Sequence, residues 1–221
     1  MSSSPLIQFD LGFSRPLIGV DEVGRGALAG PVVAVAVNFN FNEPELVTER
    51  WVLEVNDSKK LTASNRKRLT ESLQKVCNYA TASASVQEID EYGILAATFL
   101  AMSRAINQVV QISALNSKEL LILVDGNLPI KSLKLQQQTI VKGDSKSFHI
   151  AAASIMAKTH RDNLMRSLDQ RYSSDFGWDS NVGYGTEKHR QAIIKHGPTK
   201  EHRQSFLKSL LQTETQLNLL K

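Results

Sequence analysis

Two acidic residues interrupt an apolar stretch near the start of the chain and constrain what it can fold into. Residues 17–20 predict a buried strand, and Asp21 and Glu22 follow at once. A carboxylate in a strand core costs several kcal/mol unless a cation or hydrogen bonds compensate it. Adjacent strand residues point to opposite faces, so both acids can serve one site only if the backbone turns just after them. Gly24 and Gly26 make such a turn inexpensive, and a divalent metal is the simplest compensation.

The same segment also fits two other interpretations. Gly24, Gly26 and Ala29 have the spacing of a relaxed dinucleotide-binding fingerprint, which must open a helix. Residues 32–37 form a β-branched run that predicts a second strand instead, so this interpretation is disfavoured. A structural acid pair in a capped turn remains open on this segment alone.

Composition bounds the class of protein. The 221 residues suffice for one domain with a full core, and 42% hydrophobic and 22% charged residues are typical of a soluble globule. A net charge of +4 favours a polyanionic partner, although many basic proteins bind no nucleic acid. The single cysteine, Cys77, lies in a helical pattern, excludes an internal disulfide and suits a reducing compartment. The start of the chain has no signal-like segment and no stretch reaches membrane-spanning length, so we expect a soluble cytoplasmic protein.

Hydrophobic periodicity predicts five strands among several helices. The predicted strands are residues 17–22, 31–38, 79–86, 120–124 and 138–141. The predicted helices are residues 62–76, 94–112, 150–168, 187–196 and 201–213, with irregular structure over 40–50. This order predicts an α/β fold, a mixed sheet flanked by helices with a helical C-terminal cap.

Two further acids close apolar strands. Asp125 ends the strand at 120–124, and Asp144 follows the strand at 138–141 and precedes a helix. Each alone is more often a turn residue or an N-cap, but with Asp21 and Glu22 the pattern predicts convergence at one edge of the sheet. Four oxygen donors suit Mg²⁺ or Mn²⁺ and disfavour zinc. The five histidines lack ligand spacing, so we expect most of them to be solvated or to contact substrate.

Other catalytic signatures are absent from the sequence. There is no Gly-x-Ser-x-Gly nucleophile elbow and no Gly-x-x-x-x-Gly-Lys-Ser/Thr phosphate loop. Two magnesium-like ions held by carboxylates are instead a standard apparatus for in-line attack at phosphorus.

The chain resembles ribonuclease HII in eight segments that run in family order over residues 17–206. The matching segments are Asp21-Glu22-Val23-Gly24-Arg25-Gly26, Asn56-Asp57-Ser58-Lys59-Lys60-Leu61, Val124-Asp125-Gly126-Asn127, Val141-Lys142-Gly143-Asp144-Ser145, Ala152-Ala153-Ser154-Ile155-Met156-Ala157-Lys158, Arg161-Asp162, Gly183-Tyr184-Gly185-Thr186 and His202-Arg203-Gln204-Ser205-Phe206. Each match alone is unspecific, and together they are highly specific.

The resemblance implies a ribonuclease H-like fold and a metal-dependent endonuclease that leaves 5′-phosphomonoesters. Its substrates would be RNA in RNA–DNA hybrids and single ribonucleotides in duplex DNA, cut on their 5′ side. By position, the metal-binding carboxylates are Asp21, Glu22, Asp125 and Asp144, and the substrate-binding residues are Gly24, Arg25, Gly26, Lys59 and Tyr184. Gly24 to Gly26 match the loop that reads the 2′-hydroxyl, Tyr184 the tyrosine at the ribose–deoxyribose junction, and Lys59 a lysine near the scissile phosphate.

The resemblance also divides the chain. We expect an N-terminal extension over 1–16, a catalytic domain over 17–206 and a C-terminal helix end and tail over 207–221. On the helix at 150–168, Lys158 and Arg161 are candidates for phosphate contacts, and a solvated helix face is the equal alternative. Asp162 is expected to pair with neighbours of Arg161 or to lie next to the metal ligands.

Two rival functions stay open at this point. Another nuclease or strand-transferase of the same fold would use the same carboxylates without recognising ribose. A catalytically silent hybrid-binding module is disfavoured, since unpaired acids would repel a polyanion.

The last residues suggest a partner. Gln216, Leu217, Leu219 and Leu220 resemble short peptides that bind the bacterial sliding clamp, with a polar anchor followed by apolar side chains. The alternative, which we favour slightly, is that these leucines continue the last helix and pack on the body. We otherwise expect a monomer that requires Mn²⁺ or Mg²⁺.

Overall fold

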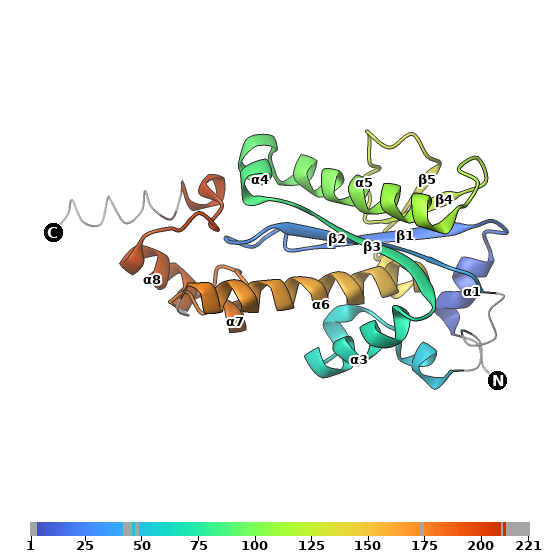
Figure 1. Cartoon of the computed structure of the whole chain (residues 1–221), viewed down its shortest axis with the longest axis horizontal. Coiled ribbons are helices and arrows are strands. Elements are labelled where there is room, and N and C mark those ends of the chain that lie inside the picture. The colour runs from blue at the N-terminus through green and yellow to red at the C-terminus, as the bar shows by residue number, and fades with distance from the viewer. Residues whose placement is uncertain (1–3, 42–45, 47–48, 173–174, 209, 211–221) are drawn as a thin grey trace.

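A five-stranded sheet forms the centre of the molecule (Figure 1). The computed structural model describes residues 4–41, 46, 49–172, 175–208 and 210. The strands are β1 (Leu17–Val23), β2 (Val32–Phe39), β3 (Cys77–Ala84), β4 (Leu121–Asp125) and β5 (Gln137–Ile140), in the order β3-β2-β1-β4-β5. β1 pairs antiparallel with β2 and parallel with β4, which confirms the predicted mixed sheet.

Helices cover both faces of this sheet. The named helices are α1 (Pro5–Leu11), α3 (Ala63–Leu73), α4 (Val86–Tyr92), α5 (Ile94–Ser113), α6 (Phe148–Arg171), α7 (Trp178–Asn181) and α8 (Glu187–His196), with 3₁₀ turns η1 (Arg50–Glu54), η2 (Ser58–Lys60) and η3 (Gly143–Ser145). Figure 1 shows α5 on one side of the sheet and α6 on the other, with α3 beyond α6 and α8 at the far end. Within the described residues, no helix combines the length and apolar character needed to cross a membrane.

The alternation of β1 explains how the two layers pack. Ile18 and Val20 join the core cluster that contains the buried residues of α5. Gly19 faces α6, and a Cβ at this position would lie 2.5 Å from the backbone carbon of His149. The missing side chain therefore lets α6 approach the strand closely, which brings residues of α6 to the acidic end of β1.

The sequence prediction was wrong at several element boundaries. The strand predicted over 79–86 begins at Cys77, so this cysteine is not helical, and burial raises its thiol pKa to about 12. Residues 86–92 form α4, which begins with a reciprocal capping box between Ser85 and Glu88. Helix α3 ends at Leu73 rather than at 76. Of the helix predicted over 201–213, residues 204–208 and 210 are helical, and 209 and 211–213 lie outside the described residues.

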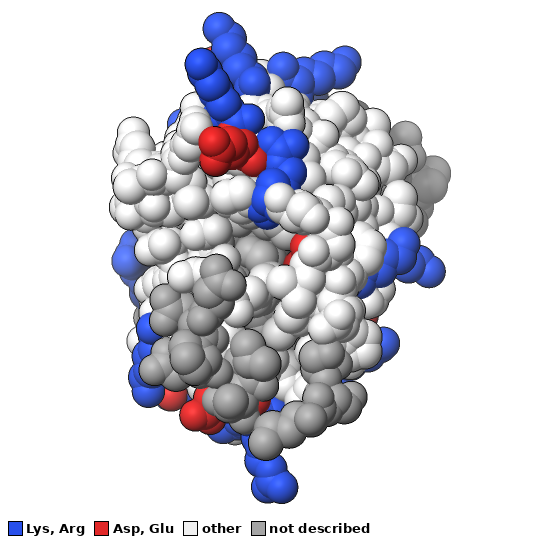
Figure 2. All heavy atoms as spheres, turned by 90° about the vertical axis from the view of Figure 1, so that its right-hand side faces the viewer, with Lys and Arg blue, Asp and Glu red and all other residues white. Residues whose placement is uncertain are grey.

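An unpredicted helix, α1, packs at the end of the sheet where β1 begins. Pro5 opens it, and the buried Asp10 accepts hydrogen bonds from the backbone N and Nδ1 of His149 at 3.0 and 2.8 Å. Figure 2 shows this end of the molecule, where most Lys and Arg side chains lie around the rim and uncharged residues fill much of the centre. The acids of β1 lie at the opposite end of the strand, so α1 supports the sheet away from them.

Candidate active site

Two neighbouring parallel strands bring three of the four predicted carboxylates to one edge of the sheet. Asp21 and Glu22 lie near the end of β1, and Asp125 is the last residue of β4. The register places Val20 beside Val124, so Asp21 and Asp125 follow at the same level on adjacent strands. Such strand ends are where sites of α/β proteins form.

The fourth predicted carboxylate reaches the site from a turn. β5 ends at Ile140, and Asp144 lies in η3 just before α6, so the prediction that it closes a strand was wrong. Its Oδ2 is 3.6 Å from Nζ of Lys59, and its charge raises the pKa of Asp125 in addition to the effect of burial. Asp144 therefore belongs to the same electrostatic cluster.

A pocket of about 450 Å³ opens beside these acids. It is lined by Asp21, Glu22, Val23, Gly24, Arg25, Gly26, Ser58, Lys59, Asp125, Ser154, Lys158 and Tyr184. Of the metal-binding and substrate-binding residues that the resemblance implies, all but Asp144 therefore line this one pocket. Of the two further phosphate-contact candidates, Lys158 lines it and Arg161 does not.

Burial and mutual repulsion raise the pKa of three carboxylates. The pKa of Asp21 lies well above its usual value, because of burial first and then the charges of Glu22 and Asp125. Burial also raises the pKa of Glu22, against the opposing effect of the Arg25 guanidinium. Burial likewise raises the pKa of Asp125, and Asp144 adds to it. A cation placed among these groups would relieve the repulsion.

Two exposed cations flank the acids. Arg25 Nη1 lies 3.3 Å from Glu22 Oε1, and the Lys59 side chain, 83% exposed, points toward Asp144. Partial burial opposes the charge of Lys59, but the negative charges of Asp144, Asp57 and Asp21 together outweigh it and raise the pKa of the lysine. Both cations are exposed although their acidic partners are largely buried, so either cation can also contact a phosphate that approaches from solvent.

The donor set fits a hard divalent cation. In the described part of the chain, no three His, Cys, Asp or Glu side chains lie close enough together to hold an ion as they stand. Asp125 Oδ1 instead accepts a hydrogen bond from Gly143 N at 2.7 Å, and Glu22 and Asp144 pair with cations. The pocket lining contains carboxylate oxygens and neither histidine nor cysteine, a chemistry that suits Mg²⁺ or Mn²⁺ and not zinc.

Two serines form part of the pocket wall, and the sequence analysis gave them no role. Ser154 on α6 hydrogen-bonds to Asp21, which lowers the pKa of that acid against the effect of burial. The hydroxyl groups of Ser154 and Ser58 lie 3.0 Å apart. Small hydroxyl residues carry no distinctive spacing, so only their places in the matching segments could have marked them.

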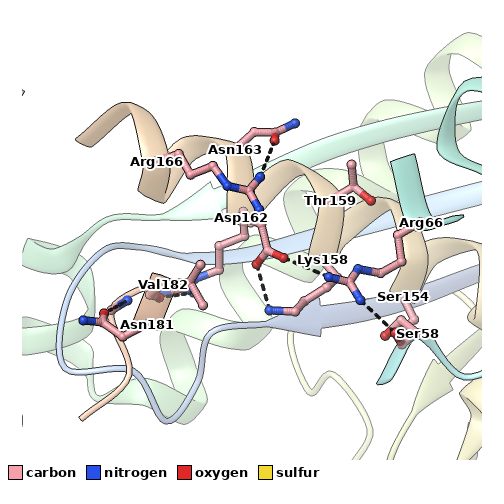
Figure 3. A network of polar contacts seen from close by, with 12 residues as sticks. Ser58, Arg66, Ser154, Lys158, Thr159, Asp162, Asn163, Arg166, Asn181 and Val182 are labelled. Atoms are coloured by element: carbon pink, nitrogen blue, oxygen red, sulfur yellow. Dashed lines mark hydrogen bonds and ion pairs between the residues drawn. The ribbon is translucent and has the colours of Figure 1, made fainter. Parts of the chain in front are cut away.

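A chain of ion pairs lies behind these serines. Figure 3 shows Asp162 between Lys158 and Arg66, and its oxygens accept from Lys158 Nζ at 2.7 Å and from Arg66 Nη2 at 3.2 Å. Arg66 also donates to the backbone oxygen of Ser58 at 3.3 Å. Asp162 therefore connects the pocket-lining Lys158 to the 3₁₀ turn that carries Lys59.

The prediction for Arg161 was wrong in both of its forms. Its side chain is fully buried, so it lies neither on a solvated helix face nor where a phosphate could reach it. It donates hydrogen bonds to three backbone carbonyls, of Ala29, Pro31 and Val182.

The loop after β1 lies beside the segment that carries Tyr184. Ala27 pairs with Tyr184 in an antiparallel bridge, and Leu28 N donates to Gly183 O at 2.8 Å. Gly24 has φ of +93°, a conformation that side-chain-bearing residues rarely adopt, so the predicted turn directly after the acids is confirmed. Loop and tyrosine together form one side of the pocket.

The expectation that most histidines are solvated or contact substrate was wrong. The buried ones are His149, His189 and His202, and the exposed ones are His160 and His196. The Nε2 atoms of His189 and His202 lie 3.2 Å apart. On its other side, His189 Nδ1 donates a hydrogen bond to Tyr184 O at 2.9 Å. His202 Nδ1 accepts a hydrogen bond from Thr199 N at 2.9 Å. This neutral pair holds the backbone of the tyrosine segment.

Acid is expected to destabilise the protein through this pair. Burial, and then the neighbouring His189, lower the pKa of His202 from 6.5 to about 4. The unfolded chain therefore binds the proton first, and the stability contributed by the neutral pair is complete above pH 6.5 and is lost as the pH falls toward 4. In urea titrations, the free energy of unfolding of His202→Gln should depend less steeply on pH in this range than that of the wild type. His196→Gln, which changes an exposed histidine, should keep the wild-type dependence on pH. The same dependence in both variants would contradict a contribution of His202 to acid sensitivity.

Solved structures place this arrangement in a known class. The ribonuclease H2 from Pyrococcus horikoshii is similar with a TM-score of 0.67 and 25% identity, over 90% of this chain and 98% of that chain. A Bst-RNase HIII in complex with Mn²⁺ is similar with a TM-score of 0.71 and 21% identity, over 95% of this chain and 74% of that chain. The fold is that of the ribonuclease H class of nucleases.

Sequence relatives narrow the class to one family. The family model described as Ribonuclease HII matches residues 18–212. Ribonuclease HII of Fusobacterium nucleatum is 46% identical over 212 residues, which are 96% of this chain and 94% of the relative. Ribonuclease HII of Sphingopyxis alaskensis is 46% identical over 190 residues, which are 86% of this chain and 88% of the relative. The chain belongs to the ribonuclease HII family. It is a ribonuclease H endonuclease, which cleaves RNA in RNA–DNA hybrids and at single ribonucleotides in duplex DNA.

Proposed function

We propose that Asp21, Glu22, Asp125 and Asp144 hold two divalent cations that serve hydrolysis of the phosphodiester bond. The observation that carries this proposal is the convergence of acids from β1, β4 and η3 beside one pocket, with raised pKa values in three of them. Such ions, when bound, supply an activated water and stabilise the attacking and leaving oxygens. Attack by water at phosphorus breaks the bond to the 3′-oxygen and leaves a 5′-phosphate.

The backbone from Gly24 to Gly26 is the proposed reader of the ribose 2′-hydroxyl. This group both donates and accepts hydrogen bonds and alone distinguishes RNA from DNA at one position. Gly26 supports the role, because a Cβ there would meet no protein atom within 4 Å, which leaves room for a sugar to approach the backbone. Arg25 and Lys59 supply exposed positive charge for the neighbouring phosphates.

Either Mg²⁺ or Mn²⁺ is proposed as the working ion. Both are hard cations that prefer the oxygen ligands of this pocket. One structural relative, Bst-RNase HIII, was solved in complex with Mn²⁺, which supports the second ion by analogy. Titrating cleavage and calorimetric binding with each ion in turn would decide between them.

A panel of three duplexes tests the proposed function against its rivals. The proposal predicts cleavage of a continuous RNA–DNA hybrid and of DNA with one ribonucleotide, and none of the matching DNA without ribose. Equal cleavage of the ribose-free duplex would favour a general nuclease. Tight binding of the hybrid without metal-dependent cleavage would favour a silent binding module.

Tyr184→Ala is expected to impair cutting at a single ribonucleotide more than cutting of a continuous hybrid. The proposed role of the ring is to stack where a deoxyribose follows the ribose, a contact of about 1–3 kcal/mol or about 5- to 150-fold in rate. The measurement is the ratio of kcat/KM on the two substrates. Tyr92→Ala, which removes an exposed ring from α4, is the matched control. Equal losses of kcat/KM on both substrates would show that Tyr184 only packs against its neighbours and has no role at the junction.

We also propose that Gln216, Leu217, Leu219 and Leu220 bind a sliding clamp. These residues lie outside the described part of the chain. Support comes from the sequence pattern and from a structural relative, the RNase HII of Archaeoglobus fulgidus, which was solved in a complex with PCNA. That structure is similar with a TM-score of 0.66 and 24% identity, over 86% of this chain and 94% of that chain.

Deleting residues 216–221 is expected to abolish clamp binding and to leave cleavage of free oligonucleotides unchanged. A polar anchor with apolar neighbours gains affinity by filling a hydrophobic groove, and the catalytic pocket needs none of these residues. Surface plasmon resonance against the bacterial clamp measures the first effect, and the duplex assay measures the second. Loss of thermal stability on deletion, or no clamp binding at micromolar protein, would reject the proposal.

A further inference from the structure

Two buried arginines hold the loop that follows β1. Arg161 on α6 and Arg203, just before the last described helical residues, are both 0% exposed. Among the described residues, neither lies within ion-pair distance of a carboxylate. A buried charge without such a partner is costly unless hydrogen bonds replace its water. The groups that accept those hydrogen bonds therefore indicate what the two arginines do.

Arg161 connects the two segments proposed to contact the substrate. Its Nε donates to Pro31 O at 3.1 Å and its Nη2 to Ala29 O at 3.0 Å, both in the segment after β1. Its Nη1 donates to Val182 O at 2.8 Å, close to Tyr184 in the chain. The guanidinium carbon also lies 5.5 Å from the centroid of the Tyr184 ring. One rigid planar group thus joins the loop and the tyrosine.

The backbone before Tyr184 is strained where Arg161 holds it. Val182 has φ of +43°, which is rare for a β-branched residue and costs about 1–3 kcal/mol. Figure 3 shows Val182 and Asn181 beside α6, and Asn181 Oδ1 accepts from Gly183 N at 2.8 Å. The strained turn is therefore fixed by a side chain on either side of it.

The loop itself is shaped around both arginines. A Cβ on Gly24 would lie 2.1 Å from Nε of Arg161, so the arginine occupies the space that a side chain would need. Arg203 donates to the carbonyls of Gly24, Arg25 and Gly30 at 2.7, 2.8 and 2.9 Å. With these carbonyl oxygens bound by Arg203, the conformation of the loop backbone is fixed.

We propose that Arg161 is a positioning residue that sets the distance between the Gly24–Gly26 loop and Tyr184, with Arg203 holding the other side of the loop. The proposal rests on the proposed function, in which the loop reads the ribose and the tyrosine lies at the junction. Correct placement of both is needed at a single ribonucleotide, whereas a continuous hybrid offers ribose at every step. Arg161 therefore determines substrate preference without touching the substrate.

The test compares Arg161→Lys, Tyr184→Ala and the double variant on the two substrates, per folded molecule. Lysine keeps the positive charge but lacks the planar guanidinium group, whose N–H groups donate to three carbonyls. A displacement of about 1 Å should lower kcat/KM about 100-fold on the single-ribonucleotide duplex and about tenfold on the hybrid. If Arg161 acts through Tyr184, the double variant should lose no more preference than Tyr184→Ala alone.

Asp10→Asn is the matched control, because it removes the charge of a buried carboxylate that accepts from His149 at the other end of β1. It should leave the substrate ratio unchanged. An unchanged ratio in folded Arg161→Lys would overturn the proposal, and so would additive losses in the double variant when Tyr184→Ala by itself shifts the ratio. If Arg161→Lys does not fold, Arg203→Lys takes its place: a shifted ratio supports the proposal and an unchanged one overturns it. If Tyr184→Ala alone leaves the ratio unchanged, the proposed role of the tyrosine fails, and a shifted ratio in Arg161→Lys would still support positioning of the loop.

Discussion

Asp125→Asn is expected to lower cleavage about 1,000-fold, since removing a charged metal ligand forfeits about 4 kcal/mol of stabilisation in the transition state. The amide oxygen can still accept the hydrogen bond from Gly143 N, so the fold should be retained. Asp21→Asn should behave in the same way. Both changes remove a carboxylate whose pKa is raised by burial, which at neutral pH is a cost to the folded state. Both variants should therefore unfold at the same or a higher temperature than the wild type in metal-free buffer.

The control is Asp169→Asn, which changes a buried carboxylate of α6 that accepts a hydrogen bond from Trp178 N at 2.6 Å. Its amide oxygen can still accept that hydrogen bond, so this variant should keep both its fold and its metal-dependent cleavage per folded molecule. Single-turnover rates with saturating Mg²⁺ or Mn²⁺, together with thermal unfolding, measure both properties. Full activity in folded Asp21→Asn or Asp125→Asn would contradict the proposed metal site.

Gly26→Ala is expected to lower cleavage about 100-fold without a loss of stability, because its methyl group would displace the sugar from the backbone by about 1 Å. The protein itself has room for that methyl group, since nothing lies within 4 Å of the position. Gly24→Ala should lose activity for a different reason. Its Cβ would collide with Arg161, and its φ of +93° is strained for alanine, and each of these effects costs about 1–3 kcal/mol of stability.

Urea unfolding and kcat/KM on the hybrid separate the two glycines. The expected result is low activity in both variants and reduced unfolding free energy only in Gly24→Ala. Wild-type cleavage by Gly26→Ala would contradict backbone recognition of the ribose. Equal destabilisation by both substitutions would show that the loop is tightly packed throughout.

The sheet and the acidic pocket were predictable because their signals are local. A β-branched run predicts a strand, and an acid at its end needs a compensating charge, so Asp21, Glu22 and Asp125 could be assigned to one edge of the sheet. Asp144 was assigned to the same site although its turn was taken for a strand end. The resemblance to ribonuclease HII then supplied Lys59 and Tyr184, which no periodicity marks.

The buried polar groups could not be predicted in the same way. Arg161 and Arg203 bind backbone carbonyls more than 100 residues away in the chain, and any residue type supplies such a carbonyl. A charged or imidazole side chain is exposed by default, so His189 and His202 were also placed wrongly. Of the elements missed, α4 carried a usable signal in its capping box, whereas α1 offered only a proline at its start.

One assay tests the central claim most directly. A duplex with a single ribonucleotide, labelled at the 5′ end of that strand, is incubated with the protein in Mg²⁺, in Mn²⁺ and in excess chelator, and the product is sized at nucleotide resolution. The predicted result is one cut on the 5′ side of the ribonucleotide with either or both ions and none in chelator. Cleavage that persists in chelator would contradict a metal site formed by Asp21, Glu22, Asp125 and Asp144. Equal cleavage of a ribose-free duplex would contradict reading of the ribose by the backbone of residues 24–26.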